Sequence, residues 1–359
     1  MTHLTKFKAD LAASNIDAAI ISNKLNQRYL TDFDFEDGLV LVTKGQSYLI
    51  TDFRYAEAAH AQASKEFCVL TPKGGQLLCI AGLLSDNACH CVAVEDQSLS
   101  HAEFLHYGEI LRDFALMAGA SAILANLRLY KDEKELETIA RAQAITDAAF
   151  AHIVKQITPQ MTEIEVALEL EFFMRRNGAD ALAFETIAVS GRNSSRPHGV
   201  PRRCKLEKGF LTMDFGAAVN GYCSDMTRTV VLGRADADMK KLYQTVLTAQ
   251  TSALEAAAEG VDCKALDKIA RDIIEGAGYT GCFGHSLGHG VGMLVHENPR
   301  LSPAIPDGVL LSRGHVVTFE PGIYVEGKYG CRIEDMACVR PDGSFYDFTQ
   351  SSKEMIELF

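Results

Sequence analysis

The sequence lacks any long hydrophobic run, which limits where the protein can act. Its longest apolar stretch, residues 77–84, runs into Ser85, Asp86 and Asn87, whereas a membrane-spanning helix needs about 20 apolar residues. Residues 1–21 mix charged and apolar positions and contain no continuous apolar segment of the kind found in a signal peptide. We therefore expect no membrane partner and no export, and we predict a cytoplasmic protein.

Positive charge and paired cysteines are also scarce. The chain has 35 Lys and Arg residues against 47 Asp and Glu residues, which gives a formal net charge of −12. A protein that binds nucleic acid usually presents a basic face, so this balance opposes a nucleic-acid partner. The ten cysteines include no C-x-x-C pair, and a chain of this length needs no disulfides to fold, so we expect reduced thiols in a cytosol.

What is present fits a folded protein of about two domains. The chain has 359 residues, of which 47% are hydrophobic and 23% charged, and domains average roughly 150 residues. Helical and strand-like patterns alternate early in the chain, which predicts an αβ first domain over residues 1–127. Its expected helices cover residues 3–14, 55–63 and 102–118, and its expected strands cover 18–22, 38–43, 47–51, 91–94 and 122–125.

A charged run at residues 131–135 begins a second domain, which we place at residues 128–359. Thr162 and Glu165 form a capping box that predicts the start of a helix, and short β-rich segments with Gly and Pro dominate beyond residue 183. The fold class is therefore α/β (α+β). The expected helices of this domain cover residues 136–157, 162–177, 237–259 and 264–276.

Two acidic residues lie on the arms of a predicted hairpin at residues 211–229. An Asn-Gly pair at residues 220–221 is a strong signal for a two-residue turn. With that turn, Asp225 faces Gly216, and Asp214 lies diagonally opposite on the same face. Such a diagonal separates Cα atoms by roughly 7–8 Å, which suits two carboxylates that share cations, and the glycine leaves room for a large ion. The alternative is that both acids face solvent on the sheet.

A second pair of acids, Glu320 and Glu334, ends two further β-like segments, and the alternative role of Glu320 is a salt bridge with Arg332. Between the two pairs lies His289, flanked by glycines that allow close approach of a ligand. The four carboxylates carry a charge of −4, which two divalent ions would neutralise. Oxygen donors with one imidazole favour Mn²⁺, Fe²⁺, Co²⁺ or Zn²⁺, and two such ions would activate a bridging water for hydrolysis.

Two other motifs compete with this interpretation. Residues 284–288 (GHSLG) match the G-x-S-x-G pattern of a nucleophile at Ser286, but that device requires a helix after the serine, and several glycines follow instead. The glycines of residues 288–292 fail the dinucleotide-binding pattern because the third glycine is misplaced. Metal-dependent hydrolysis is therefore favoured over a serine hydrolase, which stays a lesser alternative.

Ordered motifs along the chain carry a resemblance to a known family. They lie at residues 190–199, 213–216, 224–229, 288–292, 295–297, 320–322 and 332–335. With them the chain resembles the pita-bread metallopeptidases, specifically the branch of Xaa-Pro aminopeptidases (aminopeptidase P) and Xaa-Pro dipeptidases (prolidases). Residues 26–31 and 51–55 are similar to signatures of the first domain in this branch. The resemblance implies an N-terminal creatinase-like αβ domain, followed by a pita-bread catalytic domain with a curved antiparallel sheet flanked by helices.

The resemblance also implies a role for each site residue. The metal ligands would be Asp214, Asp225, His289, Glu320 and Glu334. They would bind two divalent metal ions per chain, with Mn²⁺ favoured and Co²⁺ or Zn²⁺ as alternatives. Glu320, His198 and His296 would be catalytic, and His198, His285, His296 and Arg332 would bind the substrate.

The implied activity is hydrolysis of the Xaa-Pro bond, at the N-terminus of peptides or in dipeptides, through attack of a metal-bridged hydroxide. The substrates would be proline-containing peptides, and the enzyme would be a homodimer. The alternative is a non-catalytic peptide-binding pseudo-enzyme of the same fold.

Overall fold

The computed structural model describes residues 1–359 as two compact units, Met1–Arg128 and Leu129–Phe359. The first unit contains a six-stranded sheet with the order β4-β3-β2-β1-β5-β6, in which β1, β5 and β6 run parallel and β2 is antiparallel to both neighbours. Its helices are α1 (His3–Ala13), α2 (Lys24–Thr31), α3 (Phe53–Gln62), α4 (Gln76–Asp86), α5 (His101–Ile110) and α6 (Ala120–Leu129). Its strands are β1 (Ala18–Ile21), β2 (Gly38–Thr43), β3 (Ser47–Thr51), β4 (Phe67–Leu70), β5 (Cys91–Val94) and β6 (Ala115–Met117).

The end of this unit differs from the sequence-based expectation. The expected helix 102–118 ends at Ile110, and its last residues form β6, which pairs in parallel with β5. The expected strand 122–125 is instead part of α6, because its apolar residues belong to a helical face that buries Ala120 and Leu124 one turn apart. The apolar run 77–84 lies within α4, and no helix of residues 1–359 is long and apolar enough to cross a bilayer.

The second unit consists of two pairs of helices and of sheets that are antiparallel except at the last strand of the chain, which pairs in parallel. The helices are α7 (Glu133–Gln156), α8 (Glu163–Arg176), α9 (Ala237–Glu255) and α10 (Cys263–Gly276), with a 3₁₀ turn η1 (Gly191–Ser195). Its first strands are β7 (Ala181–Leu182), β8 (Ile187–Ser190), β9 (Gly209–Phe215), β10 (Ala217–Val219), β11 (Tyr222–Cys223) and β12 (Met226–Leu232). The later strands are β13 (Gly288–Gly290), β14 (Glu297–Leu301), β15 (Val316–Phe319), β16 (Gly322–Val325), β17 (Tyr329–Arg332), β18 (Asp335–Val339), β19 (Phe345–Asp347) and β20 (Glu357–Leu358).

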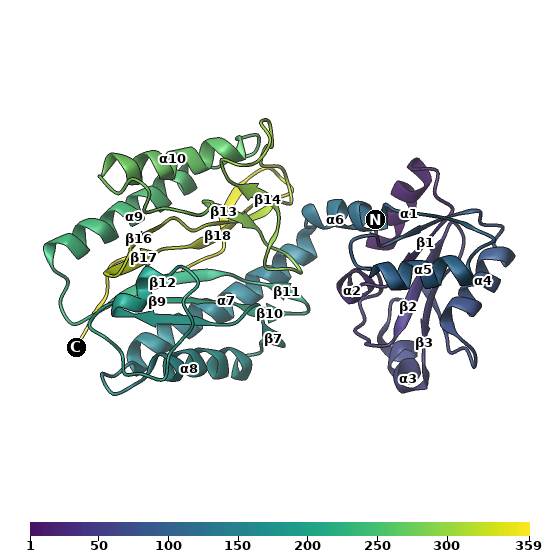
Figure 1. Ribbon diagram of the computed structural model, residues 1–359, viewed down its shortest axis with the longest axis horizontal. Helices are drawn as coiled ribbons and strands as arrows, with labels where there is room; N and C mark the ends of the chain where they lie inside the picture. Colours follow the sequence, from purple (N-terminus) through teal and green to yellow (C-terminus); the bar gives the residue numbers. More distant parts are fainter. The chain divides into compact units, whose positions relative to one another are not determined.

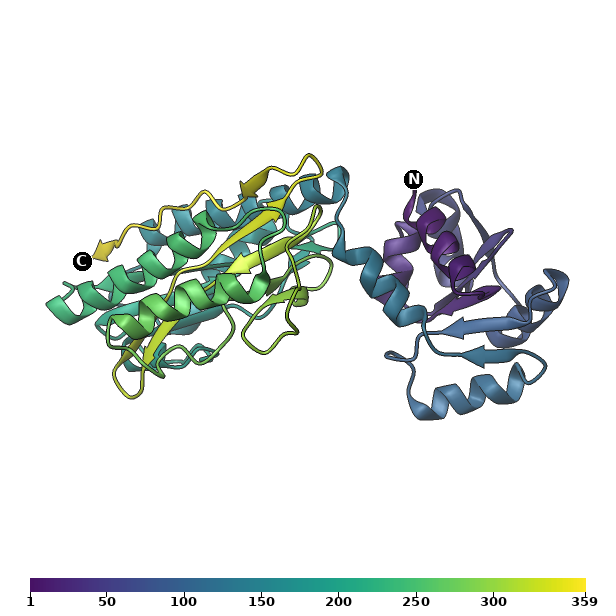
Figure 2. The same ribbon diagram turned by 90° about the horizontal axis from the view of Figure 1, so that it is seen from above.

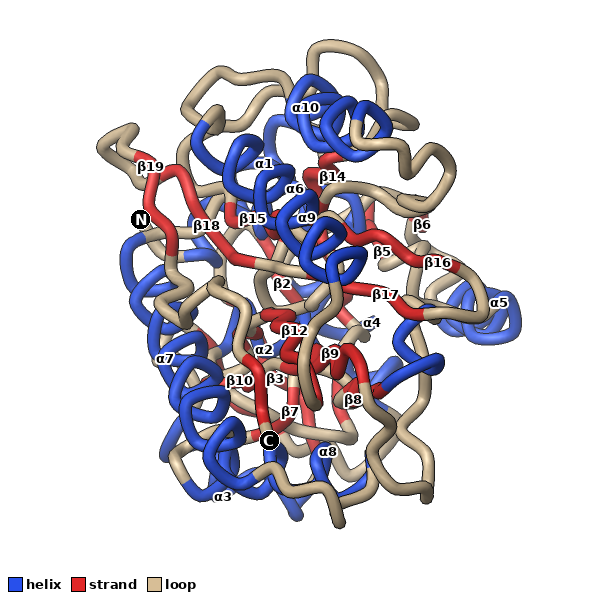
Figure 3. The backbone as a smooth tube through the Cα atoms, turned by 90° about the vertical axis from the view of Figure 1, so that its left-hand side faces the viewer, coloured by secondary structure: helices blue, strands red, loops and turns tan.

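The strands of this unit lie between the two helix pairs. Figure 1 shows α9 and α10 on one side of the strands and α7 and α8 on the other. In the view from above in Figure 2, the green helices α9 and α10 lie in front of the strands. Figure 3 shows the same helices in blue around the red strands β9, β12 and β18. Each pair has its own core, because α9 and α10 pack on β15 and β18, whereas α7 and α8 pack on β8, β9 and β12. This arrangement is the pita-bread fold with its two helical covers.

The predicted turn and helix caps of this unit are present. The Thr162 side chain and Glu165 form the capping box of α8, and Asn177 is the C-cap of this helix. The Asn-Gly turn pairs Val219 with Tyr222, and the same register continues into β9 and β12, where Asp214 faces Thr227. A two-residue turn fixes the register of both arms, which is why the sequence could predict it.

The expected space for an ion at Gly216 is absent. A Cβ atom at this position would lie 2.0 Å from the carbonyl oxygen of Ser224. The glycine therefore permits close approach of the neighbouring backbone, and it leaves no cavity of its own. The space for ligands is instead the cavity that Asp214 and Asp225 line, which is described below.

Candidate metal centre

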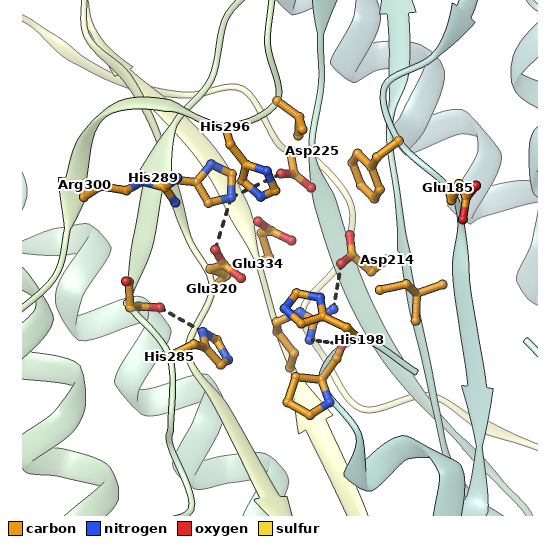
Figure 4. Close-up of a pocket in the computed structure, with 16 residues that line it drawn as sticks. Glu185, His198, Asp214, Asp225, His285, His289, His296, Arg300, Glu320 and Glu334 are labelled. Carbon is orange, nitrogen blue, oxygen red and sulfur yellow. Dashed lines mark hydrogen bonds and ion pairs between the residues drawn. The ribbon is translucent and has the colours of Figure 1, made fainter. Parts of the chain in front are cut away.

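Five strand ends of the second unit bring the predicted ligands to one cavity. Asp214 lies in β9, Asp225 directly precedes β12, and His289 lies in β13. Glu320 directly follows β15, and Glu334 directly precedes β18. All five side chains line a cavity of about 370 Å³ and point toward its centre (Figure 4).

The ligand atoms approach one another closely. His289 Nε2 lies 3.6 Å from Asp225 Oδ2 and 3.3 Å from Glu320 Oε1. Asp225, His289 and Glu334 each offer one ligand atom within 4.8 Å of the others, which is the spacing of a group that could hold a metal ion. His289 Nδ1 lies 3.1 Å from the carbonyl oxygen of Gly290, so the carbonyl accepts the Nδ1 proton and Nε2 is left as the free donor of an electron pair.

The carboxylates are buried together with little compensating charge. Burial raises the pKa of Asp225 and of Glu334 well above its ordinary value, and repulsion between neighbouring carboxylates raises both further. Burial also raises the pKa of Asp214, although the nearby Arg332 guanidinium opposes the shift. A cavity that disfavours its own negative charge is a good receptor for cations.

Glu320 differs from the other three acids. Burial opposes its ionisation, but the contact with His289 and the nearby Arg332 guanidinium outweigh burial and hold its pKa at about 2. Its side chain retains 17% exposure, compared with 6% for Asp225. Glu320 is therefore an ionised carboxylate at the accessible edge of the ligand group, where it can accept a proton.

Arg332 connects several members of the site. Its guanidinium donates to Asp214 Oδ2 at 2.7 Å and to the Thr227 hydroxyl at 2.9 Å. Thr227 in turn donates to Glu334 at 2.7 Å. Arg332 thus holds Asp214 directly and Glu334 through one hydroxyl, and the alternative salt bridge with Glu320 is not formed.

The predicted cleft histidines surround this group. His198 follows η1 and is exposed, and His296 precedes β14, where its ring packs edge-on against His289 with the ring centroids 4.4 Å apart. His285 Nδ1 lies 2.9 Å from the Ser286 carbonyl, and its Nε2 lies 3.0 Å from the Tyr324 hydroxyl. Both nitrogens of His285 are therefore occupied by protein groups, whereas no protein group hydrogen-bonds to the rings of His198 and His296.

Sequence reasoning missed Thr227, Tyr324, Arg300 and Glu185. Arg300 lies directly opposite His289 across β13 and β14 and lines the cavity. That pairing contains a register irregularity after His289, so no pattern along the chain could predict it. Glu185 lies in the loop between β7 and β8, and nothing in its sequence surroundings signals a cavity.

The alternative interpretation at Ser286 is not supported by its backbone. A nucleophile elbow places the serine between a strand and a helix. Ser286 is followed by strand β13, and residues 287–359 contain no helix. Ser286 lines the cavity, but it lacks the local structure that would activate it.

Comparison with known proteins identifies the family. Residues 137–341 match the model of metallopeptidase family M24, and residues 3–130 match the creatinase/prolidase N-terminal domain. The chain belongs to metallopeptidase family M24. The predicted resemblance and the predicted fold class are thereby confirmed.

Similar proteins cover nearly the whole chain. An uncharacterised peptidase, YqhT of Bacillus subtilis, is 38% identical over 99% of this chain and 99% of its own. The structure of an Xaa-Pro dipeptidase from Bacillus anthracis superposes with a TM-score of 0.93 at 36% identity, over 99% of both chains. An X-Pro aminopeptidase from Thermotoga maritima has a TM-score of 0.90 at 35% identity, over 96% of this chain and 98% of its own. The M24 family implies divalent metal ions, and the carboxylate and histidine group is the candidate site for them.

Proposed function

We propose that this M24 metallopeptidase hydrolyses the Xaa-Pro bond at the N-terminus of its substrates, with two divalent metal ions. The observation that carries the proposal is the convergence of four carboxylates and one imidazole on a single cavity. The relatives named above include proteins described as an Xaa-Pro dipeptidase and an X-Pro aminopeptidase.

The residues present fit a pair of metal ions. Asp214 Oδ1 is buried and has no hydrogen-bond partner within the protein, which is costly unless a cation occupies that side of the carboxylate. Oxygen donors with one imidazole suit Mn²⁺, Co²⁺ or Zn²⁺. The ligands would be Asp214, Asp225, His289, Glu320 and Glu334. Bound there, divalent ions would lower the pKa of a water molecule and polarise the scissile carbonyl.

The side chains around the ligands would carry out the proton transfers and orient the substrate. Glu320, ionised and accessible, would take the proton of the attacking water and deliver it to the leaving amine. His198 and His296, whose rings keep free nitrogens at the cavity, would donate hydrogen bonds to the scissile carbonyl as negative charge develops there. Arg332 would keep Asp214 and, through Thr227, Glu334 in place. His285, which is predicted to bind the substrate, would do so through contact with its ring, because protein groups already occupy both of its nitrogens.

Arg300 favours a dipeptidase over an enzyme for longer peptides. It lines the cavity beside His289 and makes no side-chain hydrogen bond or ion pair with the described residues. A guanidinium with free donors matches a carboxylate in geometry and charge. In an Xaa-Pro dipeptide, the proline carboxylate would lie close enough to the scissile bond to reach it.

Metal identity, assembly and compartment are further parts of the proposal. The donor set supports Mn²⁺, with Co²⁺ or Zn²⁺ as alternatives. A homodimer is proposed from the family resemblance, and a cytoplasmic location from the composition of the chain. Metal analysis of the purified protein and light scattering would test the first two directly.

The activity is tested with a panel of Xaa-Pro and Xaa-Pro-Yaa-Zaa peptides. The protein is stripped of metal with a chelator, and Mn²⁺, Co²⁺ or Zn²⁺ is then added back. We expect cleavage before proline to disappear on stripping and to return with metal, while an active-site-directed phosphonate has no effect. Cleavage that survives the chelator would refute the metal mechanism, and tight stoichiometric metal without turnover would favour the peptide-binding pseudo-enzyme.

The role of Arg300 is tested by comparing Xaa-Pro with its C-terminal amide. Arg300→Gln should lower kcat/KM for the free dipeptide roughly 10-fold or more and leave the amide almost unchanged, because only the free dipeptide has a carboxylate to bind. Arg203→Gln, which removes an exposed arginine outside the cavity, is the matched control. Equal losses on both substrates would show that Arg300 does not read the carboxylate.

A further inference from the structure

One wall of the cavity combines apolar side chains with an isolated carboxylate. Phe184, Glu185 and Ile187 lie between β7 and the start of β8 and line the cavity. Ile187 faces Asp214 across β8 and β9, so the two side chains lie on the same face of the sheet, about 5 Å apart at Cβ. The Phe184 ring packs against Gly216, with Cε1 3.0 Å from the position of a Cβ there. This wall therefore adjoins the Asp214 edge of the ligand group.

Glu185 stands apart from the other acids of the cavity. The remaining four carboxylates are the proposed metal ligands, whereas Glu185 is exposed and makes no hydrogen bond or ion pair with the described residues. Figure 4 shows Glu185 on one side of the ligand group and Arg300 on the opposite side. The cavity thus presents a free anion at one end and a free cation at the other.

This polarity sets the direction of a bound dipeptide, if the proposed function is correct. With the proline carboxylate at Arg300 and the scissile carbonyl at the ligand group, the first residue extends toward Glu185. Its side chain would then lie along Phe184 and Ile187, beyond Asp214.

We infer that Phe184, Ile187 and Glu185 form a subsite for the first residue of the substrate and that this subsite prefers Lys or Arg. The methylene stem of a long basic side chain would pack on the two apolar residues, while its charged end reaches the carboxylate. An acidic first residue would be repelled by the same carboxylate. A neutral side chain of similar length, such as Met, would keep only the apolar contact.

A competing role for Glu185 is binding of the substrate's α-ammonium group. Every Xaa-Pro substrate carries that group, so loss of Glu185 would then lower kcat/KM equally for all of them. A side-chain subsite instead predicts a change that depends on the charge of the first residue. The two roles can therefore be separated by a substrate series.

The experiment measures kcat/KM of the metal-loaded enzyme for Lys-Pro, Arg-Pro, Met-Pro and Glu-Pro. Glu185→Gln should lower kcat/KM for Lys-Pro roughly 2-fold to 5-fold and leave Met-Pro unchanged, because exposed charge pairs are weak. Glu185→Lys should reverse the order of Lys-Pro and Glu-Pro. The matched control carries the same charge changes at Glu275, an exposed residue of α10 outside the cavity. Raising the salt concentration should reduce the preference of the wild-type enzyme.

Binding of uncleavable analogues gives a second readout. Lys-Pro and Met-Pro with a reduced amide bond are titrated by calorimetry, and Glu185→Gln should weaken only the lysine analogue. Equal changes for all substrates, or no change for any, would overturn the subsite. If the wild-type enzyme cleaves no Xaa-Pro bond, the proposed function fails, and the calorimetric comparison still decides whether the subsite exists.

Discussion

Glu334 and Asp335 are adjacent in the sequence and both are buried, yet their electrostatic surroundings are opposite. Asp335 accepts hydrogen bonds from Arg228 at 2.7 Å and from Gln250 at 2.9 Å, and it forms an ion pair with Lys353. Burial opposes ionisation of Asp335, but the charges of Arg228 and Lys353 outweigh it and lower its pKa. The protein itself therefore compensates this charge.

Glu334 points into the cavity instead and lacks such compensation. It accepts a hydrogen bond from Thr227 at 2.7 Å, and its pKa is raised well above the ordinary value by burial and by the charges of Glu320 and Asp214. Two neighbouring residues at the start of β18 thus serve different purposes. A buried carboxylate with protein cations around it stabilises the fold, whereas one surrounded by other carboxylates requires charge from outside.

The strongest test of this contrast removes charge from the ligand group. If Glu334 and Asp225 are metal ligands as proposed, Glu334→Gln and Asp225→Asn should each lower kcat/KM on Xaa-Pro substrates roughly a thousandfold or more, because each substitution would weaken metal binding at the reacting bond. Kinetics should be accompanied by measurement of bound metal, which should fall in parallel. Asp272→Asn, at an exposed position on α10, is the control. Near-normal turnover with full metal content in either variant would show that these acids are not ligands.

The second test compares stability at the two neighbouring positions in metal-free protein. Asp335→Asn should reduce the free energy of unfolding by about 3–5 kcal/mol, because it leaves Arg228 and Lys353 near a neutral group. Glu334→Gln should cost little or be stabilising, because it relieves repulsion among buried acids. Urea denaturation of both variants measures the difference. Similar losses at both positions would remove the distinction between them.

The sequence could predict features that depend on short-range rules. The register of the Asn-Gly hairpin placed Asp214 and Asp225 on one face because a two-residue turn leaves no choice of pairing. The capping box at Thr162 depended only on a local pattern in the same way. The ordered motifs were sufficient to identify the family, which the match over residues 137–341 confirms.

Features that depend on distant partners could not be predicted. Strand β6 forms because β5 supplies its hydrogen bonds, and its residues alone resemble the end of a helix. The sequence predicts that Arg332 binds the substrate, with a salt bridge to Glu320 as the alternative, and only the fold shows that Arg332 pairs with Asp214 and that Thr227 connects it to Glu334. Arg300 lies at the cavity in a strand pair with a register irregularity, and Glu185 lies there in a loop. Neither feature leaves a periodic pattern in the sequence.

The smallest expected effect concerns Asp347, which lies next to the Asp335 group. Burial and the charge of Asp335 raise the pKa of Asp347 to about 7. A carboxyl whose folded-state pKa is raised contributes stability below its unfolded pKa, near 3.8, and that contribution is lost as the pH rises through about 7. Asp347→Asn keeps an oxygen that can accept from the Thr349 backbone and cannot ionise. We therefore expect this variant to match the wild type at pH 4 and to exceed its stability at pH 8, by at most about 4 kcal/mol for the full shift and by less because the Asp347 side chain is 28% exposed and its charge is screened.

Unfolding of the two proteins across this pH range, repeated in an Asp335→Asn background, tests the cause of the shift. If the charge of Asp335 contributes to the raised pKa, the gain from Asp347→Asn should shrink in that background, although burial still maintains part of it. An undiminished gain would mean that burial acts alone. A variant no more stable than the wild type at pH 8 would show that Lys353, 4.0 Å from Asp347, already compensates this carboxylate as it does Asp335.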